Sequence, residues 1–599
     1  MTNCRWTSGL FIRAAIVVLS MVFAAGAVRA DEAEPPEDDG RILVEGGDAL
    51  IGLHRDEMTE RIENSIRRAC LYLKKTQARD GSWIPRDSTI RNPRRPRAQF
   101  GNRRVVVNNF MRDRVVGANG IVVMGLLYAG VNADNPTVLR GLGFLAKNQK
   151  DVDFTYTRGV IACAFCLADP HRKNEKMAGI VEDNIEWLLK AQAKNPYHLW
   201  QYRFNSRFFD FSCTQFAVEA LRMAEQQGYR VPRKHLTAVR KAIHTCHLPD
   251  GMWPYSWNPR MKNVPALNRR GRKTMTAATL ACLAWLDARL ADPQRDAFRP
   301  DPHLVKGLEA VNRIYDGMSE EDAVGIATPH YLAYCYERAG VLTGTRYFGG
   351  RDWYREIAAH IIKGQDRSGA YEPYTLTRDE AFDTAFGTGF YLLFLGKGLA
   401  PTIVGRLDWG PTSKGTLHDM GNLTDALTRE LGRHLNWVTV PIEADAGEYK
   451  KVPLLYITGN DDPFDDLMKH RDTFDAYLEA GGTLLAAGFK NRPEFERGFK
   501  KFVKTIRPGT TFEELPLKHT LYRRWHEMDK PHGLVGSRTP KVARPLALLV
   551  TEPFAAPLNR GGGRDYKEAA QLGVNTILYL TQLDKRTSFL DDIMPPREK

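Results

Sequence analysis

The sequence predicts a multidomain protein, with an all-α domain of paired helices followed by an α/β domain. A helical hairpin recurs along residues 58–398, and its turn reads Leu/Ile-x-x-x-Gln-x-x-Asp-Gly-x-Trp. Such a hairpin cannot bury its apolar face alone, so its copies must stack or close into a ring. Beyond this region, apolar runs of strand length alternate with helical periodicity. The 599 residues also exceed what one hydrophobic core usually holds.

The N-terminus has the three parts of a secretory signal. Arg5 and Arg13 precede an apolar run over residues 14–28, and a small-residue cleavage pattern ends at Ala30. We expect cleavage after Ala30, so that residues 1–30 form a signal peptide and the protein is exported to the periplasm or the cell exterior. The alternative is an uncleaved anchor, but the apolar run is shorter than the ~20 residues that a spanning helix needs.

An amphipathic helix opens each repeat. Residues 31–57 are expected to form a flexible leader, and the first amphipathic helix is expected over 61–77 with apolar residues on one face. The pair Asp80-Gly81 is a suitable stop for this helix. The same leucine or isoleucine register recurs at Leu145, Leu188, Ile243 and Ile361, with a degenerate copy expected near 303–314.

A second helix, apolar nearly all round, follows each amphipathic one. Helices of this kind are buried. They are expected at 115–130, 158–169, 211–225, 274–289, 326–340 and 383–398. Six amphipathic helices that alternate with six apolar helices predict an inner ring of helices inside an outer ring.

This region resembles the prenyltransferase and squalene-cyclase repeat family, whose members form an α/α toroid with a Gln-to-Trp turn in each repeat. The resemblance is specific at Gln77, Gly81 and Trp83 of the first copy. The motif departs from the family where His247 replaces the glutamine and where Tyr371 replaces the tryptophan. The resemblance implies an α6/α6 toroid over residues 58–398.

The chain changes character after the repeats. Residues 399–420 contain several Gly and Pro and predict a linker. In residues 421–599, strands alternate with helices, which predicts a doubly wound parallel sheet. The strands are expected at 451–459, 483–489 and 545–550, and the helices at 466–482 and 566–581.

The C-terminal half resembles a bacterial domain of unknown function, number 4159, which looks like the flavodoxin-like fold of class I glutamine amidotransferases. The matching text is LLYITGNDDP, YLEAGGTLLAAGF, ELPLKHTLYRRW and AAQLGVNTILYL. An amidotransferase needs a cysteine on the turn after a central strand, with a histidine that activates it. No cysteine follows Cys335, and the expected turn reads Ala487-Gly488-Phe489. This argues against acyl transfer and leaves ligand binding at the strand ends, near 458–462 and 488–492.

The resemblance of the toroid implies two chemistries that this sequence does not match. A squalene-type cyclase protonates its substrate from D-x-D-D-T-A, but in EAFDTA the aromatic Phe382 stands at the position of the acid, and Asp383 is expected to cap a helix. Protein prenyltransferases bind zinc through Asp, Cys and His, for which Asp210, Cys213 and His330 are the candidates. Their spacing departs from the family, so a packed core histidine is the alternative. No cofactor is therefore expected unless these three residues hold zinc.

Toroids of this shape also serve glycan hydrolases and lyases, so aromatic side chains near the turns are candidate ligand contacts. These are Trp253, Tyr255, Trp257 and Tyr374. The structural alternative is that the turn tryptophan only fills space between outer helices.

The net charge of +14 is uneven along the chain. Residues 86–114 hold nine arginines against two acids, without clear periodicity, which predicts an exposed insertion. It could contact an anionic lipid, glycan or protein, and the alternative is a solubilising loop. The candidate contacts are Arg91, Arg94, Arg95, Arg97, Arg103 and Arg104. Nucleic acid is disfavoured as a partner for an exported chain without a nucleic-acid motif.

The cysteines are expected to be structural. Seven follow the signal segment, all in apolar helical text, which predicts small buried hydrophobes rather than a disulfide framework. Cys163 and Cys166 fit C-x-x-C but lie inside a helix pattern, so a redox role is disfavoured.

We therefore expect an exported, non-catalytic envelope protein that binds a ligand or another protein. The toroid cavity would hold an apolar or glycan ligand or a peptide, and the α/β domain or the arginine-rich insertion would contact an envelope protein. The competing expectation is an enzyme that acts on an isoprenoid or a polysaccharide inside the toroid.

Overall fold

The computed structural model describes residues 56–83, 104–262, 264–290, 301–318, 329–373, 380–410, 413, 418–489, 492–540, 542, 544–585 and 588–596. The expected signal peptide and nearly all of the leader lie outside these residues. So do Tyr374 and five of the arginines, Arg91, Arg94, Arg95, Arg97 and Arg103, while the backbone of Arg104 begins a helix. None of the described helices is both long enough and apolar enough to cross a bilayer.

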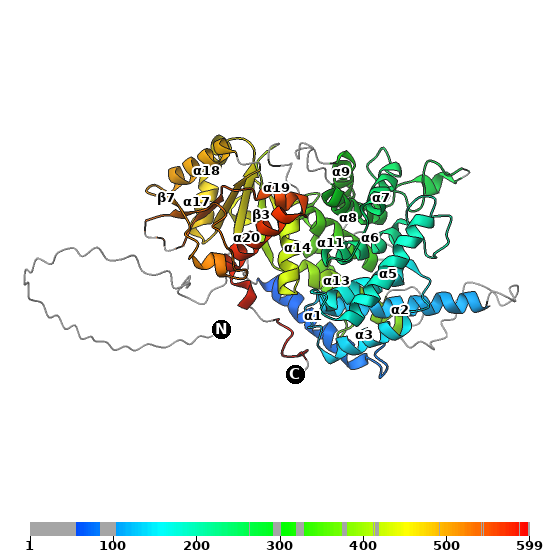
Figure 1. Cartoon of the computed structure of the whole chain (residues 1–599). Coiled ribbons are helices and arrows are strands. Elements are labelled where there is room, and N and C mark those ends of the chain that lie inside the picture. The colour runs from blue at the N-terminus through cyan, green and yellow to red at the C-terminus, as the bar shows by residue number, and fades with distance from the viewer. Residues whose placement is uncertain are drawn as a thin grey trace, which may run out of the picture. The chain divides into compact units, whose positions relative to one another are not determined.

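The all-α domain consists of two sets of helices that alternate along the chain (Figure 1). The amphipathic set is α1 (Glu57–Thr76), α3 (Pro136–Asn148), α5 (Glu175–Lys194), α7 (Arg233–Thr245), α9 (Pro302–Asp316) and α12 (Trp353–Lys363). The apolar set is α2 (Arg104–Tyr128), α4 (Thr155–Ala168), α6 (Phe211–Gln226), α8 (Lys273–Leu290), α11 (Pro329–Thr343) and α13 (Glu380–Gly398). The predicted pairs of helices are confirmed, most of them within three residues at each end.

The inner helices form a closed ring. Each packs against the next, and α13 packs against α2. Glycines permit this closing contact, because a β-carbon on Gly125 would lie only 2.5 Å from the carbonyl oxygen of Gly389. The outer ring closes as well, since Ser65 on α1 donates to Oε1 of Gln365, which follows α12, at 2.9 Å. The predicted double ring is therefore confirmed, and the rings are closed, which the sequence alone does not decide.

In three of the turns, a tryptophan is hydrogen-bonded to the C-terminal part of the outer helix that precedes it. Nε1 of Trp83 donates to the carbonyl oxygen of Leu73 at 2.6 Å. Trp253 makes the equivalent bond at 2.9 Å. Trp200 donates in the same way to Leu188 at 2.8 Å, although its turn lacks the Asp-Gly pair. The Leu73 carbonyl lies in the last turn of α1, where the helix supplies no N–H donor, so the Trp83 bond satisfies it.

The repeated glutamine links its turn to the next outer helix. Nε2 of Gln77 donates to the carbonyl oxygens of Gly81 at 3.0 Å and of Thr137 at 2.9 Å, and its Oε1 accepts from Nε of Arg140 at 2.9 Å. Gly81 has a φ of +91°, and a β-carbon there would lie 2.1 Å from the Arg140 carbonyl oxygen. Only glycine therefore allows the turn to approach α3 this closely.

The C-terminal part contains a sheet that has seven strands in its described residues, in the order β4-β3-β5-β6-β9-β8-β7. Strands β4, β3, β5, β6 and β9 run parallel, whereas β7 and β8 pair antiparallel at one edge. The strands are β3 (Thr402–Asp408), β4 (Asn436–Pro441), β5 (Leu454–Gly459), β6 (Thr483–Gly488), β7 (Thr511–Glu514), β8 (Leu534–Arg538) and β9 (Ala547–Val550). A short hairpin in the toroid pairs β1 (Tyr347–Phe348) with β2 (Arg351–Asp352).

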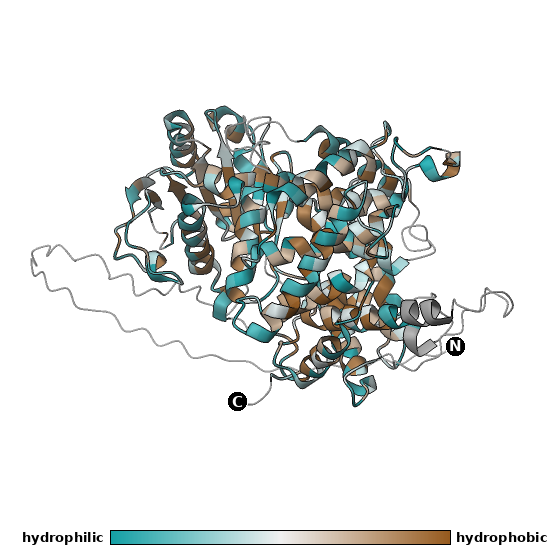
Figure 2. Cartoon of the chain, turned by 45° about the vertical axis from the view of Figure 1, so that its right-hand side comes forward, coloured by the Kyte–Doolittle hydropathy of each residue, from teal (hydrophilic) through white to brown (hydrophobic). Residues whose placement is uncertain are grey.

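Helices cover both faces of the large sheet, as the doubly wound prediction requires. One face packs against α14 (Asp419–Leu431) and α20 (Arg564–Thr581), and the other against α17 (Arg471–Glu479) and α18 (Pro493–Ile506). Figure 2 shows the apolar residues gathered on the strands between these helices. The shorter helices are α15 (Ala446–Tyr449), α16 (Phe464–Met468) and α19 (Ala555–Arg560), with 3-10 turns η1 (Ala266–Arg269), η3 (Thr520–Arg523) and η4 (Leu583–Lys585).

Two expectations for the C-terminal part need correction. The sheet is mixed rather than wholly parallel, because β8 pairs antiparallel both with β9 and with the edge strand β7. The segment 399–420, expected as a linker, contains β3, which lies between β4 and β5 in the sheet. Its strand character is masked by Arg406, whose charge is buried 3.5 Å from Asp419.

The last described residues, 588–596, return to the toroid instead of staying with the α/β domain. Arg67 on α1 pairs with Asp592. Leu590 and Met594 are fully buried in the hydrophobic core that the toroid helices form. The C-terminal segment therefore fastens the end of the chain to the first outer helix.

Candidate functional site

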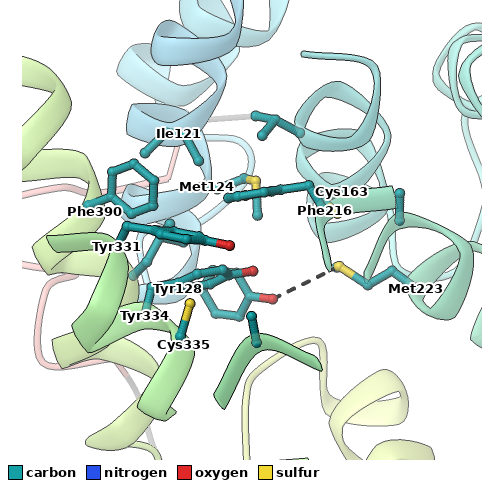
Figure 3. Close-up of a cluster of buried hydrophobic side chains, with 14 of the residues drawn as sticks. Ile121, Met124, Tyr128, Cys163, Phe216, Met223, Tyr331, Tyr334, Cys335 and Phe390 are labelled. Carbon is teal, nitrogen blue, oxygen red and sulfur yellow. Dashed lines mark hydrogen bonds between the residues drawn. The ribbon is translucent and has the colours of Figure 1, made fainter. Parts of the chain in front are cut away.

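Side chains fill the centre of the inner ring (Figure 3). Phe216 on α6 stacks on Tyr334 on α11 with ring centroids 5.5 Å apart, although α8 lies between these two helices in the ring. Likewise, the hydroxyl of Tyr128 on α2 lies 3.9 Å from the sulfur of Met223 on α6, across α4. Contacts between helices that are not neighbours occupy the space in which the sequence led us to expect a ligand.

A cluster of charged side chains lies in the C-terminal halves of the inner helices α6, α11 and α13. Glu219 on α6 accepts hydrogen bonds from Arg222 at 2.9 Å and from Arg338 on α11 at 2.7 Å. Burial alone would raise the pKa of Glu219, but the two arginines outweigh it and hold the pKa well below its usual range. Lys397 on α13 is also buried, and burial together with Arg338 lowers its pKa to about 7.

This ion cluster connects the toroid with the α/β domain. Arg222 reaches Asp425 on α14 at 3.7 Å, and Arg222 also donates to Gln226 at 3.0 Å. Gln226 in turn donates to Asp425. Buried ion pairs of this kind fix how two elements pack rather than supply a reactive group.

A carboxyl group and two phenols meet at the opposite end of α6. Asp210 caps this helix, since its Oδ1 accepts from the backbone N–H groups of Ser212 at 2.7 Å and Cys213 at 3.4 Å. Burial raises the pKa of Asp210, and hydrogen bonds from Ser212 and Tyr255 offset only part of this increase. The hydroxyls of Tyr255 and Tyr202 lie 3.0 Å apart. The arrangement could transfer a proton if a substrate reached it.

The candidate zinc ligands of the sequence do not come together. Among the described residues, the donor atoms of Asp210, Cys213 and His330 do not gather within 4.8 Å of one another. His330 is buried, its Nε2 lies 2.9 Å from the carbonyl oxygen of Glu372, and its ring stacks on Tyr391 at 4.1 Å. These contacts agree with the alternative interpretation, a packed core histidine.

The remaining candidates are placed as follows. Asp383 is buried inside the first turn of α13 and does not cap it, because this helix begins at Glu380. Trp253 is fully buried against His247, so it fills space in the turn. Tyr255 is 39 % exposed and Trp257 is half-buried, which leaves both accessible to a ligand.

A shallow groove of about 620 Å³ opens on the same end of the toroid as Asp210. Trp187 and Phe204 line it and contact each other with ring centroids 5.3 Å apart. Arg203 forms ion pairs with Asp113 at 3.2 Å and Asp153 at 3.5 Å beside them. The groove thus offers charges of both signs next to aromatic surface. Its residues come from separate helices and loops, so no spacing in the sequence predicts it.

The α/β domain has no nucleophile where an amidotransferase carries one. The buried Phe489 directly follows β6, and its N–H donates to the Gly459 carbonyl oxygen at 2.9 Å. The ends of β5 and β6, expected to form a ligand site, do lie side by side. However, Trp409 covers them, with its Nε1 donating to the Thr458 carbonyl oxygen at 2.8 Å.

The cysteines agree with the structural interpretation. The seven in the described part of the chain are free and buried. Burial raises the pKa of both Cys163 and Cys166 far above the usual value, so these thiols stay protonated and unreactive.

One group of described residues does bring metal-binding atoms together. His244, Asp301 and His303 each place one donor atom within 4.8 Å of the other two. The sequence does not indicate this group, because the two segments that form it are far apart along the chain.

Comparison with curated proteins finds no match for this chain. A solved structure that it resembles is a variant of the type II terpene cyclase MstE from Scytonema in complex with its substrate, geranylgeranyl dihydroxybenzoate. The identity is 15 % and the TM-score 0.25, over 57 % of this chain and 98 % of the other. Residues 408–581 match the model of a family described as a domain of unknown function, DUF4159. The C-terminal part of the chain is therefore a DUF4159 domain.

Proposed function

We propose that this chain is an exported binding scaffold of the cell envelope and carries out no reaction itself. The packed centre of the inner ring carries this proposal, because Phe216, Tyr334 and their neighbours occupy the place where a toroid enzyme would bind its substrate. Phe489 supports the same proposal for the α/β domain, because this buried residue follows β6 at the position where an amidotransferase carries its nucleophile. Both domains then serve to present surfaces to a partner.

The groove on the toroid is the surface best suited to a partner. A peptide segment with charges of both signs fits it, since the exposed Lys190 can bind a carboxylate while the exposed Asp183 and Glu186 can bind cationic side chains. The aromatic side chain of Trp187 adds apolar contact area, as aromatic residues do at many protein interfaces.

Site-specific photo-crosslinking in cells tests the groove. A photoreactive residue in place of Lys190, whose side chain is 61 % exposed on α5, should capture one defined envelope protein. The same replacement at Lys363, an exposed lysine on the outer helix α12, should not. Adding Arg203→Ala should weaken capture at position 190, because it removes the ion pairs with Asp113 and Asp153 that hold that side of the groove. Equal capture at both positions, or no capture at position 190, would contradict the proposal.

The second candidate function is an enzyme that uses Asp210 as a proton donor or acceptor, which its raised pKa and the nearby phenols favour. Asp210→Asn separates the two functions, because asparagine caps a helix as well as aspartate does and the fold should persist. A catalytic Asp210 would lose roughly 100- to 10,000-fold in the turnover of an isoprenoid or polysaccharide substrate. A scaffold would keep its crosslinking at position 190 unchanged.

We also propose that export removes residues 1–30. Expression in an exporting bacterial host should yield a mature protein whose N-terminal sequence begins at Asp31. Ala30→Trp should block cleavage, because signal peptidase requires a small residue at that position. Recovery of the uncleaved chain in the membrane fraction would instead indicate an anchor.

A further inference from the structure

The fourth turn of the toroid uses histidines where other turns use glutamine. In the first turn, Oε1 of Gln77 accepts from a side chain of the next outer helix, Arg140. In the fourth turn, His247 takes the place of the glutamine, and its Nδ1 lies 2.8 Å from Nδ1 of His303 on α9. One of these nitrogens must donate a hydrogen and the other accept it. A pair of imidazoles therefore replaces the usual link between outer helices.

Two more donors lie beside this pair. His244 is one helical turn before His247, and its Nε2 lies 2.8 Å from Oδ2 of Asp301. The other oxygen of Asp301 accepts from the backbone N–H of His303 at 2.8 Å, which fixes the carboxylate at the start of α9. The rings of His244 and His303 stack with their centroids 4.2 Å apart.

The three donors are close enough for one metal ion. Each of His244, Asp301 and His303 has a donor atom within 4.8 Å of the other two. Two ligands that bind the same zinc ion at about 2.1 Å lie no more than about 4.2 Å apart. Small rotations of these side chains would therefore bring all three donors onto one ion.

The contact with His247 determines which ring nitrogen of His303 can bind an ion. Because Nδ1 of His303 contacts His247, Nε2 is the nitrogen left for an ion. Histidines that bind metals usually donate their other ring N–H to an acceptor that orients the ring. Trp253 stacks on the His247 ring at 4.1 Å and holds this acceptor in place.

We propose that His244, Asp301 and His303 form a Zn²⁺ site between α7 and α9, with His247 as a positioning residue. Two imidazoles and one carboxylate form a donor set that zinc accepts, with a fourth position open to water. The His244 side chain is 27 % exposed, so an ion can enter. The ion joins two outer helices, of which α9 belongs to the degenerate copy of the repeat. The site does not depend on the proposed scaffold function.

Metal binding to the full chain tests this site. The protein, purified without a polyhistidine tag and stripped with a chelator, should take up one Zn²⁺ per chain in elemental analysis and calorimetry. Zn²⁺ should also raise its melting temperature, because the ion binds the folded state. Asp301→Asn keeps the cap of α9 and removes the carboxylate, so it should lower the affinity by about 100-fold or more.

Substitutions of His247 test its positioning role. His247→Leu removes the acceptor and should lower the Zn²⁺ affinity by about 10- to 100-fold. His247→Gln restores the residue of the other turns, still offers an oxygen to His303, and should bind nearly as well as wild type. His360→Ala removes an exposed histidine on α12 and should change nothing. Unchanged affinity in both Asp301→Asn and His303→Ala would overturn the proposal and indicate adventitious binding to surface histidines.

Discussion

Glu219→Gln should lower the free energy of unfolding of the full chain by about 3–5 kcal/mol. The substitution removes the carboxylate nearest to both Arg222 and Arg338, which are buried, and leaves each of them only a carboxylate at 3.7 Å. A buried charge that loses its partner costs far more than an exposed one, because water cannot replace the lost contact. Denaturant titration followed by circular dichroism measures the change.

The same carboxylate makes stability depend on pH. The pKa of Glu219 is held below its ordinary value of 4.5 in the folded protein, so its contribution is full above that value and is lost as the pH falls through the folded pKa. Wild type should therefore lose stability below pH 4.5, and Glu219→Gln should lose less over the same range.

Two further variants test whether the loss of stability comes from the ion cluster. Glu309→Gln, at an exposed position on α9, should leave the unfolding curve unchanged. Combining Glu219→Met with Arg222→Met should recover part of the lost stability, because it removes both the buried carboxylate and one of its arginines, while Arg338 keeps Glu337 at 3.7 Å. An unfolding midpoint of Glu219→Gln equal to that of wild type would show that the ion cluster contributes nothing.

Gly389→Leu should prevent the inner ring from closing and cost more than about 3 kcal/mol. A β-carbon at Gly389 would lie 2.9 Å from the Cα atom of Val122, and backbone atoms cannot move aside as a side chain can. Helices α2 and α13 would separate, and both should exchange their amide hydrogens faster. Hydrogen exchange with mass spectrometry, together with thermal melting, measures this effect.

The matched control is Gly143→Leu on the outer helix α3. No atom lies within 4 Å of a β-carbon at Gly143, and leucine favours a helix more than glycine does. This variant should melt at the wild-type temperature or slightly above it. If the two glycine variants melted alike, close packing of α2 on α13 would not be what closes the ring.

The sequence predicts those elements whose signals are local. Helix α6 was expected at 211–225 and runs over Phe211–Gln226, because its apolar composition and the preceding turn are both readable. Strand β3 was missed because Arg406 interrupts the apolar run, and only the fold supplies its partner Asp419. The role of Trp200 was also missed, since its turn has a different sequence although its indole likewise donates to a carbonyl of the preceding outer helix.

The candidate sites are less predictable because they depend on contacts between distant segments. His247 stands out in the sequence only as a departure from the repeat, and its partner His303 follows 56 residues later. Nothing in that spacing indicates a contact. Conversely, the candidate set of Asp210, Cys213 and His330 was suggested by the resemblance and by residue types, and among the described residues the helices do not bring the three donor atoms together.

The closed ring also sets the earliest time at which the toroid can finish folding. Ser65 on α1 bonds to Gln365, which is 300 residues later, so neither ring can close until most of the toroid has been made. At the usual rate of synthesis, roughly 15–60 s separate these two residues. During that interval the apolar helix α2 has no α13 to cover it, and exposed apolar surface promotes aggregation. The rate at which the second half of the chain is made therefore controls the yield of folded protein. A chaperone that shields the first half during this interval would raise that yield.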